Sequence, residues 1–68
     1  MKKIIIVSNI VNEEEFVNEI VNEMPVAFGA KYEFIDMEDV ILVEDGHEQE
    51  AVDWLKKNHV RCVLEDEL

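Results

Sequence analysis

The chain contains one cysteine, one proline and two glycines in 68 residues, and it has no long apolar run. The single cysteine, Cys62, excludes an internal disulfide framework. Near the amino end, Ile4–Val7 supplies only four consecutive apolar residues. Because that run is too short for a signal peptide or a membrane span, we expect a cytoplasmic protein.

Basic residues are scarce as well. Lysine and arginine total 6 against 17 aspartates and glutamates, which gives a formal net charge of −11. Neither residues 4–30 nor residues 32–55 contain a lysine or an arginine. Nucleic acids and membrane surfaces are anionic and would repel such a chain, so we expect neither to bind it directly. Basic proteins are the partners that its charge favours.

Apolar residues make up 49% of the chain. That fraction is higher than in a disordered acidic tail, so hydrophobic burial can offset the chain entropy. We therefore predict one folded domain over residues 1–68, near the lower size limit for a core without disulfides or metal.

The first half of the chain predicts a strand and a helix. Ile4–Ser8 is a β-branched run typical of a buried strand. Asn12 as N-cap and Glu15 three residues later form a capping-box pattern, and Pro25 ends the helix. The helix turns one apolar face inward, which comprises Phe16, Val17, Ile20, Val21 and Met24.

Two further strands are predicted in the middle of the chain. Lys31–Asp36 alternates Tyr32 and Phe34 with residues of the opposite face, as a half-buried strand does, and Val40–Val43 is a second β-branched run. The four residues 36–39 between them lack the Asn-Gly or Asp-Gly signature of a tight hairpin.

The last third predicts a helix and a strand. Asp45 and Glu48 stand at capping-box spacing before a second helix, whose last turn carries two lysines. Val60–Leu64 is typical of a strand and is followed by an acidic tail. The order βαββαβ predicts an α+β ferredoxin-like sandwich, with two helices on one face of a four-stranded, mainly antiparallel sheet. A Rossmann-like parallel fragment is the rival, but residues 8–12 lack its glycine-rich phosphate loop.

No catalytic, cofactor or metal site is predicted. His47, His59 and Cys62 would supply three zinc ligands, but not in paired spacing, and Cys62 is more typical of an apolar core residue. Calcium binding would need acidic residues at fixed offsets around Gly46, and Ile41 occupies the first of those positions. We therefore expect a protein that is not an enzyme.

The acidic residues of the first helix carry a cost. Glu15, Glu19 and Glu23 follow one another at i, i+4, where like charges destabilise a helix by a few tenths of a kcal/mol per pair. Their rise of about 6 Å per step is on the scale of neighbouring phosphates along one nucleic-acid strand. A net charge of −11 equals the charge on about 19 Å of duplex axis.

In size, charge and carboxylate placement over its whole length, the chain resembles the small acidic DNA-mimic proteins encoded by bacteriophages. That resemblance implies an inhibitor that occupies the DNA-binding surface of a basic host protein, such as a histone-like protein or a restriction or CRISPR nuclease. We expect the acidic residues that face outward to form the binding surface, and a homodimer to complete it if they lie on opposite sides. They are Glu15, Glu19, Glu23, Glu33, Asp36, Glu38, Asp39, Glu44, Asp45 and Glu48.

Two alternatives remain open. One is a small ferredoxin-like regulatory or ligand-binding module, which would require a pocket between strands and helices. The other is an inhibitor that docks by strand addition or through the apolar side chains of Trp54 and Phe28, with acidity only steering the encounter. For both aromatic residues, a place in the core is the simpler expectation.

Overall fold

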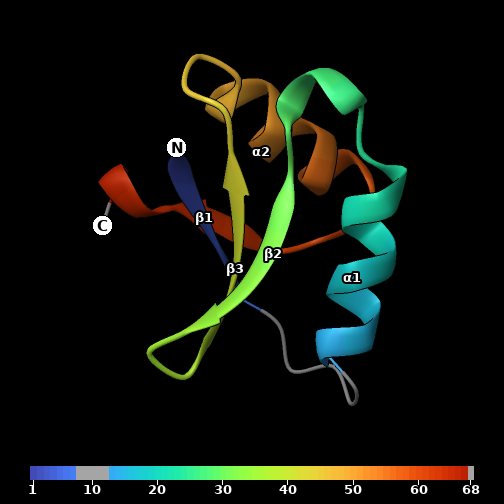
Figure 1. Ribbon diagram of the computed structural model, residues 1–68, viewed down its shortest axis with the longest axis vertical. Helices are drawn as coiled ribbons and strands as arrows, with labels where there is room; N and C mark the ends of the chain where they lie inside the picture. The colour runs from blue at the N-terminus through green and yellow to red at the C-terminus, as the bar shows by residue number, and fades with distance from the viewer. Residues whose placement is uncertain (8–12, 68) are drawn as a thin grey trace.

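The computed structural model describes residues 1–7 and 13–67. Within these ranges, four strands, two α-helices and two short 3₁₀ helices follow one another along the chain (Figure 1). Their bounds are β1 Lys2–Ile6, α1 Glu13–Glu23, η1 Val26–Phe28, β2 Lys31–Ile35, β3 Glu38–Val43, α2 Glu48–Lys57, β4 Cys62–Leu64 and η2 Glu65–Glu67.

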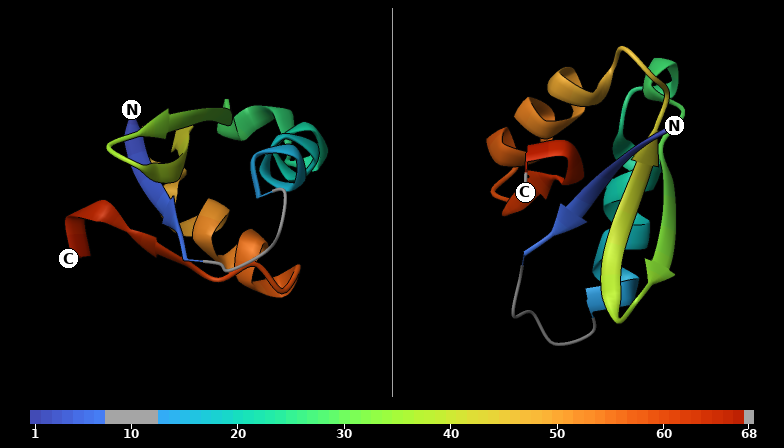
Figure 2. Two further views of the ribbon diagram at one scale, coloured as in Figure 1. Left: turned by 90° about the horizontal axis from the view of Figure 1, so that it is seen from below. Right: turned by 90° about the vertical axis from the view of Figure 1, so that its left-hand side faces the viewer.

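The four strands form one sheet in the order β2-β3-β1-β4, and every neighbouring pair is antiparallel. Both helices lie on the same side of this sheet (Figure 2). The predicted α+β architecture is confirmed, and the strand order is compatible with a ferredoxin-like layout.

The main core lies between the sheet and the helices. Its largest fully buried side chains are Ile4 of β1, Ile41 and Val43 of β3, Val17 of α1 and Leu55 of α2, each at most 1% exposed. These residues come from strand positions of one parity and from one face of each helix, as the two periodicities require. The predicted inward face of the first helix is confirmed.

The first helix has the predicted end. It finishes at Glu23, two residues before Pro25, and Met24 between them is buried. The predicted N-cap, Asn12, lies outside the described residues. Gly29 then adopts a left-handed conformation with φ of 59°, and a Cβ there would lie 2.7 Å from Cγ of Glu44.

The predicted cap of the second helix is wrong. The N-cap residue is His47 instead of Asp45, and its side chain makes no capping hydrogen bond. The Glu48 carboxylate accepts a hydrogen bond of 2.6 Å from the backbone N–H of Gly46. Asp45 is turned to another partner, since its carboxylate lies 3.2 Å from the amino-terminal ammonium of Met1.

The connection between β2 and β3 is tighter than predicted. Ile35 pairs directly with Glu38, so the loop contains only Asp36 and Met37, with φ of 50° and 68°. Two consecutive positive φ values are typical of a type I′ hairpin turn, which usually selects glycine or asparagine. The twist of the flanking strands therefore overrides the local preference of Met37.

Several strand bounds also shift. β1 begins at Lys2 instead of Ile4, and β4 begins at Cys62, after His59 takes a positive φ of 64°. Residues 65–67 of the predicted acidic tail form η2. Phe34 shares the helix-facing side of β2 with Tyr32, but near the hairpin turn it is 62% exposed.

Candidate functional site

The outer face of α1 carries a row of exposed carboxylates. Glu15, Glu19 and Glu23 are all exposed, while Val17 on the opposite face is buried in the core. A rise of eight residues along a helix is about 12 Å, so the three carboxylates form a slightly slanted row of that length. None of these three carboxylates has an ion pair with a described residue. We call these three residues the α1 acidic row.

Asp39 is not part of any outward surface. It is 8% exposed, and its carboxylate accepts a hydrogen bond from the Tyr32 hydroxyl. The prediction that Asp39 faces outward is therefore wrong. Asp39 belongs to β3, where it has the same parity as Ile41, and this places its side chain on the helix-facing side.

Three further predicted residues have local partners. Glu33 lies 3.8 Å from the Lys31 ammonium, and Asp45 lies 3.2 Å from the amino terminus. Glu48 is half-buried and bonds the Gly46 backbone. These contacts give each carboxylate a role within the fold, so their charge is partly compensated.

The remaining predicted residues lie at two ends of the hairpin. Asp36 and Glu38 are exposed beside the turn, whereas Glu44 is exposed beyond the far end of β3. A strand of six residues separates these ends by about 17 Å or more. The predicted acidic residues therefore do not form one continuous surface, and the α1 acidic row is the part that is regular and uncompensated.

One ion pair joins residues near the two ends of the chain. The Lys2 ammonium donates a hydrogen bond of 2.9 Å to the carboxylate of Asp66 in η2. This hydrogen bond raises the pKa of Lys2, and the negative charges of Asp66, Asp45 and Glu48 act in the same direction. Because Lys2 and Asp66 are 64 residues apart, no local pattern could indicate this contact.

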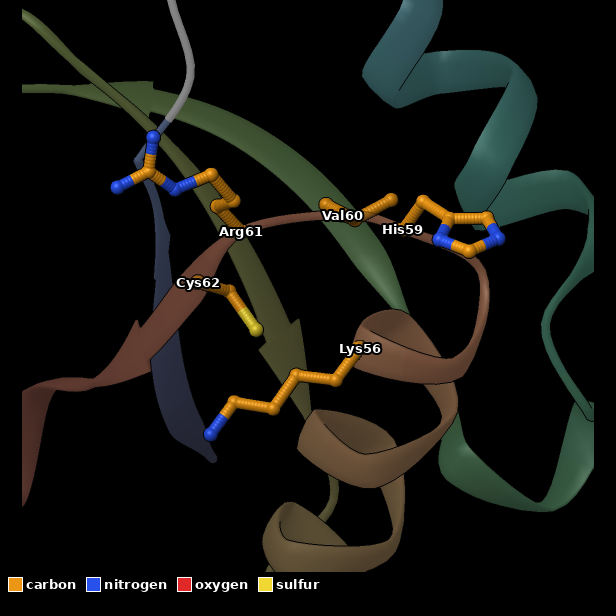
Figure 3. A pocket seen from close by; sticks show the side chains of 5 residues that line it. All are labelled: Lys56, His59, Val60, Arg61 and Cys62. Carbon is orange, nitrogen blue, oxygen red and sulfur yellow. The ribbon is translucent and has the colours of Figure 1, made fainter.

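A cavity of about 450 Å³ lies between the end of α2 and the start of β4, lined by Lys56, His59, Val60, Arg61 and Cys62 (Figure 3). The side chains of Arg61 and His59 extend in opposite directions from the chain, while the Cys62 sulfur points toward the Lys56 side chain. The three basic groups therefore do not converge on one point, as a site for a small anion would require.

Cys62 is half-buried and packs against the core, as predicted. Burial raises the pKa of the Cys62 thiol, and the charge of Lys56 opposes that shift. A raised pKa keeps the thiol protonated near neutral pH, which is the opposite of what a nucleophile or a metal ligand needs. Within residues 1–7 and 13–67, no group of three or more metal-ligating side chains is arranged to hold a metal ion.

The two aromatic residues considered for docking lie in or against the core. Phe28 is 6% exposed, with its ring centroid 5.7 Å from that of His47, and Trp54 is half-buried against the core cluster. Both residues therefore belong to the core or pack against it, as expected from the sequence.

Among the described residues, no helix has the length and apolar character needed to cross a membrane. Comparisons with protein families, with curated proteins and with solved structures find no match to this chain.

Proposed function

We propose that the protein binds the DNA-binding surface of a basic protein through the α1 acidic row and competes with DNA for that surface. The observation that carries this proposal is the row itself: Glu15, Glu19 and Glu23 are exposed, evenly spaced and without a cationic partner among the described residues.

The row supports a binding role because only one of its members favours the helix: Glu15 stands in the first turn, where the helix dipole favours a negative charge, whereas Glu19 and Glu23 do not. Like charges at i, i+4 destabilise a helix by a few tenths of a kcal/mol per pair, and Glu23 stands in the last turn, where the helix dipole disfavours a negative charge. The core contacts of α1 come from its opposite face. A surface that costs stability and contributes nothing to packing is best explained by a partner.

The charge and the spacing of the α1 acidic row indicate which kind of partner it would bind. Three carboxylates along about 12 Å of a rigid helix match a row of lysines or arginines that binds successive phosphates. Because such contacts are exposed to solvent, their strength falls as salt screens them. A partner held by apolar contacts would show little dependence on salt.

The test is a capture experiment from bacterial lysate at low salt, in which the immobilised protein is washed with excess duplex DNA. We expect DNA to release a basic DNA-binding protein, and we expect the Glu15→Gln, Glu19→Gln and Glu23→Gln triple variant to bind that protein about tenfold more weakly.

The matched control removes three exposed carboxylates elsewhere, through Asp53→Asn, Glu65→Gln and Glu67→Gln. It has the same net charge as the first variant, so steering by net charge alone would weaken both equally. Equal binding by the α1 variant and the wild type would overturn the proposal, and so would a partner that DNA does not displace.

A further inference from the structure

The side of the sheet away from the helices has a small apolar patch of its own. Ile5 pairs with Val40 on one side and with Val63 on the other, and Leu42 follows on the same face of β3. Ile5 and Val40 are already covered within the subunit, at 8% and 3% exposed, although neither belongs to the core cluster between sheet and helices. The accessible apolar surface of this side therefore comes from Leu42 and Val63, which are both half-buried. We call Ile5, Val40, Leu42 and Val63 the open-face patch; the right-hand view of Figure 2 looks toward this side of the sheet.

Charges of opposite sign flank the open-face patch along β2, β3 and β1. Lys3 and Lys31 both pair with Leu42, which makes one end of these strands basic. Glu38 pairs with Ile35 at the other end, beside the hairpin turn, and is exposed. Three neighbouring strands therefore have a basic end and an acidic end.

The outer strand β4 has the reverse polarity. Arg61 precedes β4, and its carbonyl oxygen accepts a hydrogen bond from the backbone N–H of Val7, so it lies at the same end of the sheet as Glu38. Glu65 follows β4 at the opposite end, where η2 begins. Both Arg61 and Glu65 are exposed. One end of the sheet therefore carries Lys3 and Lys31 with Glu65 on the outer strand. The other end carries Glu38 with Arg61 on the outer strand.

We propose that two copies of the protein pack open face against open face, with each strand antiparallel to its own copy across the interface. This two-fold arrangement places Lys3 and Lys31 of one subunit near Glu38 of the other, and Arg61 near Glu65. The partner is a second copy of the chain, because the charge pattern of this face is complementary to itself after a two-fold rotation.

The size and charge of the face predict a weak dimer. Four strands spaced about 4.8 Å apart and about five residues long present roughly 300 Å² of flat sheet, whereas a standard interface buries about 800 Å² per partner. Glu33 pairs with Val40 on the open face and would lie near its own copy. Two subunits with a charge of −11 also repel each other. Added salt screens that repulsion, so dimerisation strengthens with salt, whereas the proposed binding of a basic protein weakens.

The inference goes beyond the proposed function and does not depend on it. The test is sedimentation equilibrium of the pure protein from about 10 µM to about 1 mM, at ionic strengths of about 0.05 M and 0.5 M. We expect the mass to approach that of a dimer as the concentration rises, at lower concentration in the higher salt. A monomer at every concentration in both salts would overturn the proposal.

Leu42→Glu tests the patch. In the monomer the new carboxylate lies between Lys3 and Lys31, which favours folding, but in the dimer it would lie opposite Glu38 of the other subunit, where like charges repel. We expect this variant to remain monomeric. Val26→Glu is the matched control, because Val26 is apolar, 95% exposed and outside the open face, and it should dimerise like the wild type. Equal dimerisation by Leu42→Glu would count against the interface.

Charge reversal tests the orientation. Glu38→Lys should weaken the dimer about tenfold, whereas Asp53→Lys, which changes net charge equally on the exposed side of α2, should not. Combining Glu38→Lys with Lys3→Glu and Lys31→Glu should restore dimerisation. Failure of the combination to restore it would overturn the antiparallel pairing.

Discussion

The two helices have nearly equal length but different distributions of charged residues. α2 has Glu48 and Glu50 in its first turn and Lys56 and Lys57 in its last, so its charges complement the helix dipole. α1 has acidic residues along its length and no basic residue in its last turn. Both helices cover the same face of the sheet, so the difference does not come from their place in the fold.

The helices also differ in how deeply they pack. Three residues of α2, namely Ala51, Val52 and Leu55, are buried, whereas Val17 is the buried residue described for α1, with its other apolar residues half-buried. α2 is thus stabilised both by packing and by its charges. α1 has favourable charges only in its first turn, and the charges of Glu19 and Glu23 oppose it, which is why we assign binding to α1.

The largest expected difference between the helices concerns their packing, and a substitution that leaves a cavity under α2 tests it. Leu55→Ala should lower the free energy of unfolding by about 3 kcal/mol, because Leu55 is fully buried. A domain of this size has only about 3–5 kcal/mol in total, so roughly 3% to 50% of the molecules should be unfolded without urea. Urea denaturation followed by circular dichroism measures the change. Ile20→Ala in α1, at a half-buried position, should lower the free energy of unfolding by about 1 kcal/mol. A loss as large as that of Leu55→Ala would mean that α1 packs as tightly as α2.

The next effect concerns the middle of the α1 acidic row. Glu19→Lys converts two repulsive i, i+4 pairs into attractive ones, so we expect it to raise the free energy of unfolding by about 1 kcal/mol at low salt. Glu19→Gln should give about half that gain. Urea midpoints at low and high salt test both variants. A loss of stability in Glu19→Lys would mean that Glu19 supports the fold.

A smaller effect compares the last turns of the two helices. Glu23→Gln in α1 should raise the free energy of unfolding by about 0.5 kcal/mol, and Lys57→Gln in α2 should lower it by a similar amount, because each removes a charge that interacts with a helix carboxyl end. Thermal unfolding of both variants at one ionic strength gives the comparison. If both substitutions changed the free energy of unfolding in the same direction, the last turns of the two helices would not differ in how their charges interact with the dipole.

The smallest effect is on the thiol beside α2. Lys56 opposes the burial that raises the pKa of Cys62, so Lys56→Gln should raise that pKa further. Iodoacetamide should then alkylate Cys62 about twofold more slowly at pH ~8, since the thiolate is the reactive form. The pKa of Cys62 is higher in the folded chain than in the unfolded chain. The contribution of Cys62 to the free energy of unfolding is therefore fully present below the unfolded pKa and is lost as pH rises through the folded pKa. Faster alkylation would contradict the role of Lys56.

Much of the fold was predictable because local patterns are strong. The apolar spacing of α1 and α2 indicates their buried faces, and Pro25 indicates where α1 ends. The turn at Asp36 and Met37 was not predictable, because aspartate suits the first position of a type I′ turn but Met37 stands where glycine is usual.

The candidate site was predictable only where it lies on a helix. The i, i+4 spacing of Glu15, Glu19 and Glu23 predicts one exposed row, and the structure exposes all three. Asp39 was predicted outside and lies inside, because the register of β3 turns it toward Tyr32. The parity of a strand residue depends on where pairing begins, which residues 36–39 do not reveal.

The sequence by itself determined the order of elements, the buried helix faces and the excess of negative charge, because these follow from residue type and spacing along one segment. Only the tertiary structure decided which carboxylates are compensated, since Asp66 meets Lys2 and Asp45 meets the amino terminus across the chain. It alone also placed Lys3, Lys31 and Glu38 on one open face, because strand order and register bring together residues that are far apart in sequence.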